Sequence, residues 1–164
     1  MEDLVGDLDE IRSQLTFAAE IHSKLSIQNT QGMHMPQITV RTTSTRLLPQ
    51  QRERLAQELA GLMVDVLGRK PESVLVGFES LDPQAWFAGG QAPADGACLV
   101  QAHIAVVEGT GDAKAREQML QRTTEALRQA YAPVHGPVYV LFVDVPAASW
   151  GYNGRSVAAL RAQG

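Results

Sequence analysis

The chain has 164 residues, of which 45% are hydrophobic, 20% charged and 5% aromatic, and its net charge is −4. This apolar fraction excludes wholesale disorder, and no apolar run approaches the roughly 20 residues that span a bilayer. The sequence opens with Glu2 and Asp3 instead of the basic region of a secretory signal. Cys98 is the single cysteine, which excludes an internal disulfide. We therefore expect an unexported, cytoplasmic protein without a membrane segment.

The acidic charge is concentrated at the start of the chain. Residues 1–34 hold six of the 18 acidic and two of the 14 basic residues, so residues 35–164 carry twelve of each sign. A nucleic-acid-binding domain usually has a clustered basic face, and no Lys/Arg cluster occurs in this sequence. The charge pattern therefore predicts no nucleic-acid partner.

The first predicted element is an amphipathic helix over residues 4–27. Its apolar residues recur every three or four positions, which places them on one stripe of a helix: Leu4, Leu8, Ile11, Leu15, Ala18, Ile21 and Leu25. The Asn-Thr-Gln-Gly segment at 29–32 then ends the pattern. We expect three parts: an N-terminal helical extension over 1–34, a main domain over 35–158 and a tail over 159–164.

The main domain is predicted to run strand–helix–strand twice. Alternating β-branched residues predict the first strand over 37–42, and Pro49 and Gly68 mark the start and the end of a helix. The remaining elements are expected at 74–78 (strand), 89–96 (loop), 98–107 (strand), 112–131 (helix) and 138–145 (strand). The Gly-Thr-Gly-Asp segment at 109–112 lacks the lysine of a phosphate-binding loop, so we interpret it as a tight turn with Asp112 as the helix N-cap.

The two halves of the main domain resemble each other. Residues 103–106 (His-Ile-Ala-Val) correspond to 37–40 (Gln-Ile-Thr-Val), and residues 138–142 correspond to 74–78. A duplicated βαβ unit predicts an α+β fold: a mixed four-stranded sheet with two helices on one face. Because the strands at 74–78 and 138–143 are apolar on both faces, we expect neighbouring subunits to cover the other face.

Four segments, in this order and spacing, resemble the tautomerase superfamily. The Met-Pro opening at 35–40 is similar to the family's start, and 106–112 is similar to a strand-to-helix junction of 4-oxalocrotonate tautomerase. Residues 138–144 and 150–153 look like the C-terminal part of macrophage migration inhibitory factor. A ferredoxin-like ligand-binding module uses the same duplication, and for that alternative a dimer is expected.

The resemblance implies a homotrimer whose active sites lie near subunit interfaces. It also implies cofactor-independent proton transfer on the carbon beside a carbonyl, with an N-terminal proline as the base. A secondary amine in an apolar pocket has a pKa lowered from about 8 toward neutrality, because burial disfavours its cation. A base of such pKa can both take and return a proton.

The resemblance assigns roles to the site residues. Pro36 would be the base, Arg46 would contact a substrate carboxylate, and Tyr139 would act as a polariser or acid. The implied substrate-binding residues are a cation, two strand residues and an aromatic wall: Arg69 (or Lys70), His103, Ala105, Trp86 and Phe87.

This sequence also departs from the family pattern. Leu75 and Leu141 stand where relatives carry a second arginine and a pocket asparagine. Val107 and Thr110 stand at the approximate positions of the arginine pair of cis-3-chloroacrylic acid dehalogenase, so dehalogenation is not expected. One cationic anchor and an aromatic wall imply a monocarboxylated 2-oxo acid, such as an aryl or alkyl pyruvate.

The same residues have simpler explanations. Pro36 follows Met35, so its nitrogen is an amide that cannot act as a base, and proline is tolerated at a strand start. Arg46 and Arg69 would each be typical of solvated surface groups. Tyr139 and His103 could be packed strand residues, and Cys98 is interpreted as a buried apolar filler.

Three alternatives concern residues 1–34. Translation could begin at Met35, proteolysis could free Pro36, or the segment could be a retained helix that packs on the body or on a sister chain. The regular apolar stripe favours retention. In that case we expect a non-catalytic protein of the same fold, with the helix as a docking element.

Overall fold

The computed structural model describes residues 36–163, so the helix predicted over 4–27 lies outside the described residues. The order of the main elements is β1 (Gln37–Thr42), α2 (Pro49–Leu67), β2 (Leu75–Ser80), β3 (Val100–Val107), α3 (Ala113–Tyr131) and β4 (Tyr139–Val145). A 3-10 turn, η1 (Pro71–Ser73), precedes β2. Two short strands, β5 (Gly151–Tyr152) and β6 (Arg155–Ser156), and a short helix, α4 (Val157–Arg161), end the described chain.

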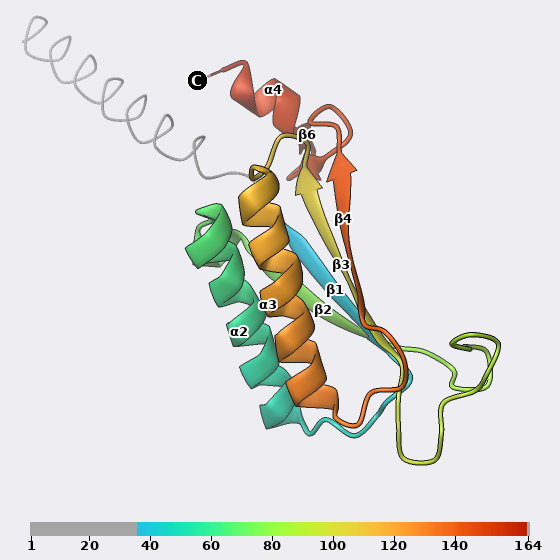
Figure 1. The fold of residues 1–164 in the computed structure, drawn as a ribbon. Helices are drawn as coiled ribbons and strands as arrows, with labels where there is room; N and C mark the ends of the chain where they lie inside the picture. Colours follow the sequence, from blue (N-terminus) through green and yellow to red (C-terminus); the bar gives the residue numbers. More distant parts are fainter. Residues whose placement is uncertain (1–35, 164) are drawn as a thin grey trace, which may run out of the picture.

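The sheet confirms the predicted duplication. Its strand order is β2-β1-β3-β4. β1 pairs with β2 and β3 pairs with β4 in parallel, while β1 and β3 join the two halves in antiparallel fashion. Both long helices cover one face of the sheet (Figure 1). The fold is therefore a mixed four-stranded sheet under two helices, built from two βαβ units.

Alternation along the strands separates a core face from an open face. Ile38 and Val40 of β1 and Ile104 of β3 are fully buried under the helices. Their pairing partners on the outer strands continue the same face, including Val76, Phe78, Val140 and Phe142. The helices complete the core with buried side chains at helical spacing: Leu55, Leu59, Leu62, Met63, Met119, Ala126 and Leu127.

The helix ends follow the predicted signals. Pro49 opens α2, and Gly68 ends it in the left-handed region at φ 62°, which glycine adopts without a steric cost. Asp112 caps α3, because its Oδ1 accepts a hydrogen bond from the Ala115 amide at 2.7 Å. The segment at 109–112 is thus a turn with an N-cap, as predicted.

The predicted start of the third strand is wrong by two residues. Cys98 and Leu99 lie before β3, because Cys98 forms an isolated bridge with Val134 instead of the sheet ladder. The Cys98 amide donates to the Pro133 carbonyl at 3.2 Å, and the Cys98 carbonyl accepts from the His135 amide at 2.7 Å. The Cys98 side chain is buried, as expected for an apolar filler, and burial raises the pKa of its thiol.

The C-terminal segment contains a helix that the sequence did not predict. A turn at Asn153 and Gly154 joins β5 to β6, and α4 follows directly. Val157 and Leu160 of α4 are buried, and the Ala158 amide donates to the Ala147 carbonyl at 3.0 Å. Five residues are too few for a recognisable apolar stripe, so tertiary contacts define this helix.

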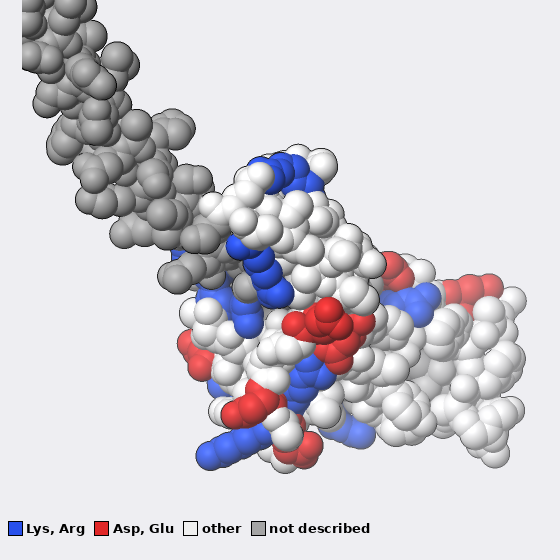
Figure 2. All heavy atoms as spheres, turned by 90° about the horizontal axis from the view of Figure 1, so that it is seen from above, with Lys and Arg blue, Asp and Glu red and all other residues white. Residues whose placement is uncertain are grey.

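On the face shown in Figure 2, the described residues do not form a patch of only positive or only negative charge. Figure 2 looks down on the molecule from the end that carries α4, and Lys/Arg and Asp/Glu side chains lie side by side on this face. Within residues 36–163, no helix is long and apolar enough to cross a membrane.

Candidate active site

Pro36 lies at the start of β1 and is buried. Its carbonyl accepts a hydrogen bond from the Leu75 amide at 3.0 Å, which joins the beginnings of β1 and β2. Because β1 and β2 are parallel, this end of the sheet collects the first residues of both strands. The antiparallel pairing brings the last residues of β3 and β4 to the same end.

Arg69 is positioned at the same end as Pro36. α2 runs back along the sheet to its C-cap at Gly68, and six residues separate this cap from the start of β2 (Figure 1). The Arg69 amide donates to the Met63 carbonyl at 3.1 Å, which fixes the chain after the helix. Its side chain is half-buried, and its Nε has no hydrogen-bond partner among the described residues.

The charge of Arg69 is poorly solvated. Burial lowers the pKa of its guanidinium, and the nearby positive Arg161 lowers it further. An arginine stays protonated in proteins despite such shifts. A partly desolvated cation with an unused donor favours an anion beside it.

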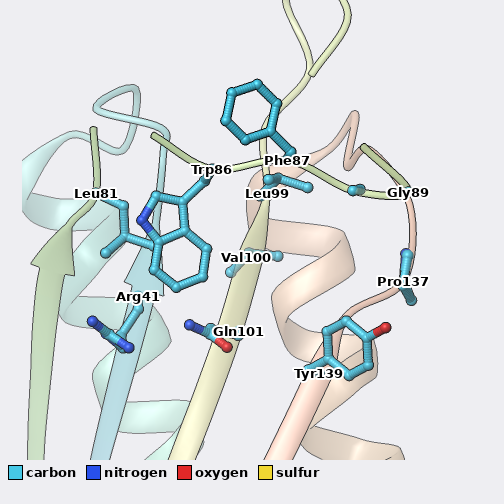
Figure 3. A pocket seen from close by; sticks show the side chains of 11 residues that line it. Arg41, Leu81, Trp86, Phe87, Gly89, Leu99, Val100, Gln101, Pro137 and Tyr139 are labelled. Atoms are coloured by element: carbon cyan, nitrogen blue, oxygen red, sulfur yellow. The ribbon is translucent and has the colours of Figure 1, made fainter. Parts of the chain in front are cut away.

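Trp86, Phe87 and Tyr139 come together at the other end of the sheet. They line a cavity of about 180 Å³ between the loop that follows β2 and the starts of β3 and β4. In Figure 3 the Trp86 and Tyr139 rings lie on either side of Gln101, and Phe87 lies at the outer rim. Trp86 is half-buried, while Phe87 and Tyr139 are 57% and 62% exposed.

A row of four side chains crosses the sheet at the floor of this cavity. Arg41 of β1 pairs with Glu79 of β2 on one side and with Gln101 of β3 on the other. Gln101 in turn pairs with Tyr139 of β4. Since side chains at paired positions point to the same face, these four residues lie in line on the open face of the sheet. We call them the transverse row.

Arg41 is held in place by two contacts. Its Nε donates to Oε2 of Glu79 at 2.8 Å, and its guanidinium carbon lies 5.5 Å from the centre of the Trp86 ring. A guanidinium over an indole face is a favourable cation–π arrangement. Among the described residues, these contacts hold the charge at the edge of the cavity without using the terminal amino groups.

The remaining predicted site residues lie elsewhere. Arg46 is an exposed residue of the loop between β1 and α2, and its Nη2 donates to the carbonyl of Gly96. It does not line the cavity. His103 and Ala105 are half-buried on the open face of β3, in the middle of the sheet, where His103 pairs with Thr39 and Leu141.

The predicted residues therefore form two groups within one chain. Pro36 and Arg69 lie at one end of the sheet, and the aromatic cavity lies at the other. Pro36 and Arg41 are five residues apart on one strand, which corresponds to about 17 Å. One chain does not bring Pro36 and Tyr139 to the same site.

Sequence reasoning missed Arg41 and Gln101. Both lie on predicted strands, and their alternation with buried neighbours indicates that they point away from the core. Their meeting with Glu79 and Tyr139 depends on strand register. Register is set by pairing between distant segments, so no local pattern reveals it.

Comparisons with known proteins agree with this architecture. No protein-family model matches the chain, and no curated protein sequence matches it. Among solved structures, a wild-type fused 4-OT asymmetric trimer matches with a TM-score of 0.65 at 20% identity, over 76% of this chain and 98% of that one. The crystal structure of Pt0534 inactivated by 2-oxo-3-pentynoate matches with a TM-score of 0.66 at 19% identity, over 75% and 98%.

A third structure extends the same likeness. The macrophage migration inhibitory factor-like protein of Entamoeba histolytica matches with a TM-score of 0.61 at 18% identity, over 75% of this chain and 99% of that one. In all three comparisons the match spans at least 98% of the solved chain and about three quarters of this one. The sheet order, the duplicated unit and these matches together show that the chain has the tautomerase fold.

Proposed function

We propose that this protein is a keto–enol tautomerase for a small 2-oxo acid, active when Pro36 carries a free amine. The observation that carries the proposal is the position of Pro36, the buried residue directly before β1 in a tautomerase fold. An amine at this buried position has its cation disfavoured, which brings its pKa toward neutrality. It can then take a proton from the carbon beside the substrate carbonyl and return it to the enol.

The other residues receive roles that suit their chemistry. Arg69 lies half-buried at the same end as Pro36, and its Nε has no hydrogen-bond partner within residues 36–163. It supplies positive charge for the enolate oxygen that forms during proton transfer. Tyr139 polarises the substrate, and Trp86 and Phe87 form the apolar wall. His103 and Ala105, half-buried on the open face of β3, also bind the substrate. A cation holds the carboxylate, and because Arg46 is exposed and does not line the cavity, this role falls to a different arginine.

We propose that the active site joins two subunits of a homotrimer. Pro36 and the aromatic cavity lie at opposite ends of one sheet, so a site that contains both needs two chains. The fused 4-OT with a similar fold is a trimer. Exposed apolar side chains on the open faces of β2 and β4, Leu75, Leu141 and Val143, supply surface for such contacts.

The direct test compares two forms of the protein. A form that starts at Pro36, made from a Met35 start by removal of the initiator, is expected to ketonise phenylenolpyruvate, followed by its absorbance. The full chain is expected to be inactive because its Pro36 nitrogen is an amide. In the Pro36-starting form, Pro36→Ala is expected to lower turnover by about 100-fold or more. Full turnover in Pro36→Ala would refute the proposal.

Covalent labelling gives a second readout. The compound 2-oxo-3-pentynoate inactivated Pt0534, and we expect it to add to the free amine of the Pro36-starting form. Intact-mass spectrometry should show one adduct per chain on that form and none on the full chain. Equal labelling of both forms would mean that a different nucleophile reacts.

The alternative is a binding protein of the same fold without chemistry. One feature of the sequence favours this alternative: Met35 precedes Pro36, so that the Pro36 nitrogen is an amide and is not basic. In this case residues 1–27 act as a docking helix for a partner. The alternative predicts that deleting residues 1–27 abolishes an association that the full chain makes, measured by co-purification from its host.

A further inference from the structure

We infer that Arg41 and Gln101 form a carboxylate-binding site in the aromatic cavity, selective for a small acid that carries one ring or a short apolar chain. This inference deepens the proposed function, because it assigns the carboxylate anchor of that site to Arg41. The binding that it predicts nevertheless requires no free amine at Pro36. It can therefore be tested on the full chain.

The size and lining of the cavity define the class of ligand. Its volume of about 180 Å³ is slightly larger than a cavity of about 150 Å³ that holds benzene. Among the described residues that line it, Arg41 alone carries a charge, and the apolar part of the wall includes Leu81, Trp86 and Leu99. One cation in an apolar cavity of this size selects a monoanion with a compact apolar body.

The donors of Arg41 are arranged for a carboxylate. Within residues 36–163, its side-chain hydrogen bond is made by Nε, to Glu79, so the terminal amino groups have their N–H donors available. Two parallel donors of one guanidinium match the two oxygens of a carboxylate. The side chain is 29% exposed, so water and salt screen this charge less than a fully exposed one.

The transverse row supplies the second polar contact and the direction of the ligand. Gln101 neighbours Arg41 on the next strand and Tyr139 lies one strand further, about 10 Å from Arg41 across two strand spacings. A carboxylate on Arg41 places the adjacent oxo oxygen over the Gln101 amide, which can donate to it. The apolar body then lies between the Trp86 and Tyr139 rings, which flank Gln101 (Figure 3).

Arg46 is less suited to this role. It is exposed, it donates to the carbonyl of Gly96, and it does not line the cavity. The carboxylate anchor of this chain is therefore Arg41, five residues earlier than the position that the family resemblance implies.

The test measures ligand binding by the full chain with Trp86 as reporter. Trp86 and Trp150 are the two tryptophans, so Trp150→Phe leaves a single fluorophore in the cavity. The probe is 3-phenylpropanoate, and its neutral analogue 3-phenylpropanamide is the control ligand. We expect the acid to quench Trp86 saturably and the amide to bind at least about tenfold more weakly. Equal binding of acid and amide, or no binding by the acid at millimolar concentration, would overturn the inference.

Matched variants separate charge from structure. Arg41→Gln is expected to weaken binding of the acid about tenfold or more. Glu79→Gln breaks the same ion pair but keeps the cation, and it should bind as well as the parent or more tightly. Arg46→Gln should change binding less than about twofold. Equal losses in Arg41→Gln and Glu79→Gln, or a larger loss in Arg46→Gln, would overturn the assignment.

Two further variants keep the test decisive. If Arg41→Gln does not fold, Arg41→Lys keeps the charge but loses the paired donors, and it should bind the acid more weakly than Glu79→Gln does. Pro36→Ala should leave binding unchanged. An inactive Pro36-starting form with this binding pattern would refute the tautomerase proposal alone. An active form whose turnover and substrate KM are unchanged by Arg41→Gln would refute the present inference alone.

Discussion

Tyr131 ends α3 above the core, where its ring is buried beside Cys98 and near Arg52. The Cys98 thiol donates to the Tyr131 carbonyl at 3.4 Å. Burial raises the pKa of the Tyr131 phenol to about 12, with a smaller raising effect from Cys98 and a lowering one from Arg52. The surroundings of Tyr131 therefore disfavour its charged phenolate form, so that deprotonation of this phenol destabilises the folded chain.

We predict that the free energy of unfolding falls as the pH rises from 10 toward 12. The unfolded chain loses the phenol proton near pH 10, while the folded chain keeps it until about pH 12. The contribution of this phenol to stability is therefore full below pH 10 and declines above it, by about 3 kcal/mol at most. Urea denaturation at a series of pH values measures the slope. Tyr131→Phe should reduce it, and a slope in this variant equal to that of the parent chain would contradict the prediction.

The turn between β3 and α3 shows how a junction between elements is specified. Gly109 and Gly111 both lie in the left-handed region, at φ 79° and 71°. Thr110 between them is buried, and its hydroxyl donates to the Val107 carbonyl at 2.6 Å. Asp112 then caps the helix. A Cβ on Gly109 would meet nothing within 4 Å, whereas a Cβ on Gly111 would lie 2.7 Å from Cδ2 of Leu67.

This pair of glycines gives a matched stability experiment. Gly109→Ala should cost about 1–2 kcal/mol, because only the left-handed backbone is strained. Gly111→Ala should cost about 1–3 kcal/mol more, because its methyl group also displaces Leu67 at the end of α2. Urea midpoints at equal m-values measure both costs. Equal costs would mean that Leu67 moves aside freely.

The elements themselves were largely predictable from the sequence, and the site only in part. Pro49, Gly68 and Asp112 are local signals, so the helix ends followed from single residues and their neighbours. Cys98 continues an apolar run, and only its pairing with Val134 explains why β3 starts later. The meeting of Arg41, Gln101 and Tyr139 requires the register of three strands, which depends on contacts between distant segments.

At the scale of the whole molecule, the open face of the sheet is the surface on which large apolar side chains remain exposed. Its edge strands expose large apolar side chains: Leu75, Tyr139, Leu141 and Val143 are 55%, 62%, 43% and 41% exposed. Its centre carries polar residues, including Thr39, Arg41 and Gln101. Exposed apolar side chains that cluster along a sheet edge are typical of surfaces that contact other protein chains.

We predict that the protein is a trimer and that charged substitutions on β4 dissociate it. Light scattering should give three times the chain mass of 17.8 kDa. The double change Leu141→Lys and Val143→Lys should shift the protein to a monomer, because it places cations in an apolar contact. Leu48→Lys changes a more exposed leucine, at 63%, that lies off the sheet, and it should leave the trimer intact. A mass twice that of the chain would instead favour the dimer of the ferredoxin-like alternative.

The distance between Pro36 and the aromatic cavity has a genetic consequence. In the proposed trimer, which forms a closed ring, the Pro36 of each chain meets the cavity of one neighbour, and its own cavity meets the Pro36 of the other neighbour. Every active site therefore contains residues from two chains. A chain that is defective at both ends disables two sites when it enters a mixed ring. Two chains with complementary defects, one at Pro36 and one at Trp86, would together rebuild an intact site that neither can form alone. Whether a mixed population of chains is active would then depend on which chains assemble together, and not on any single chain.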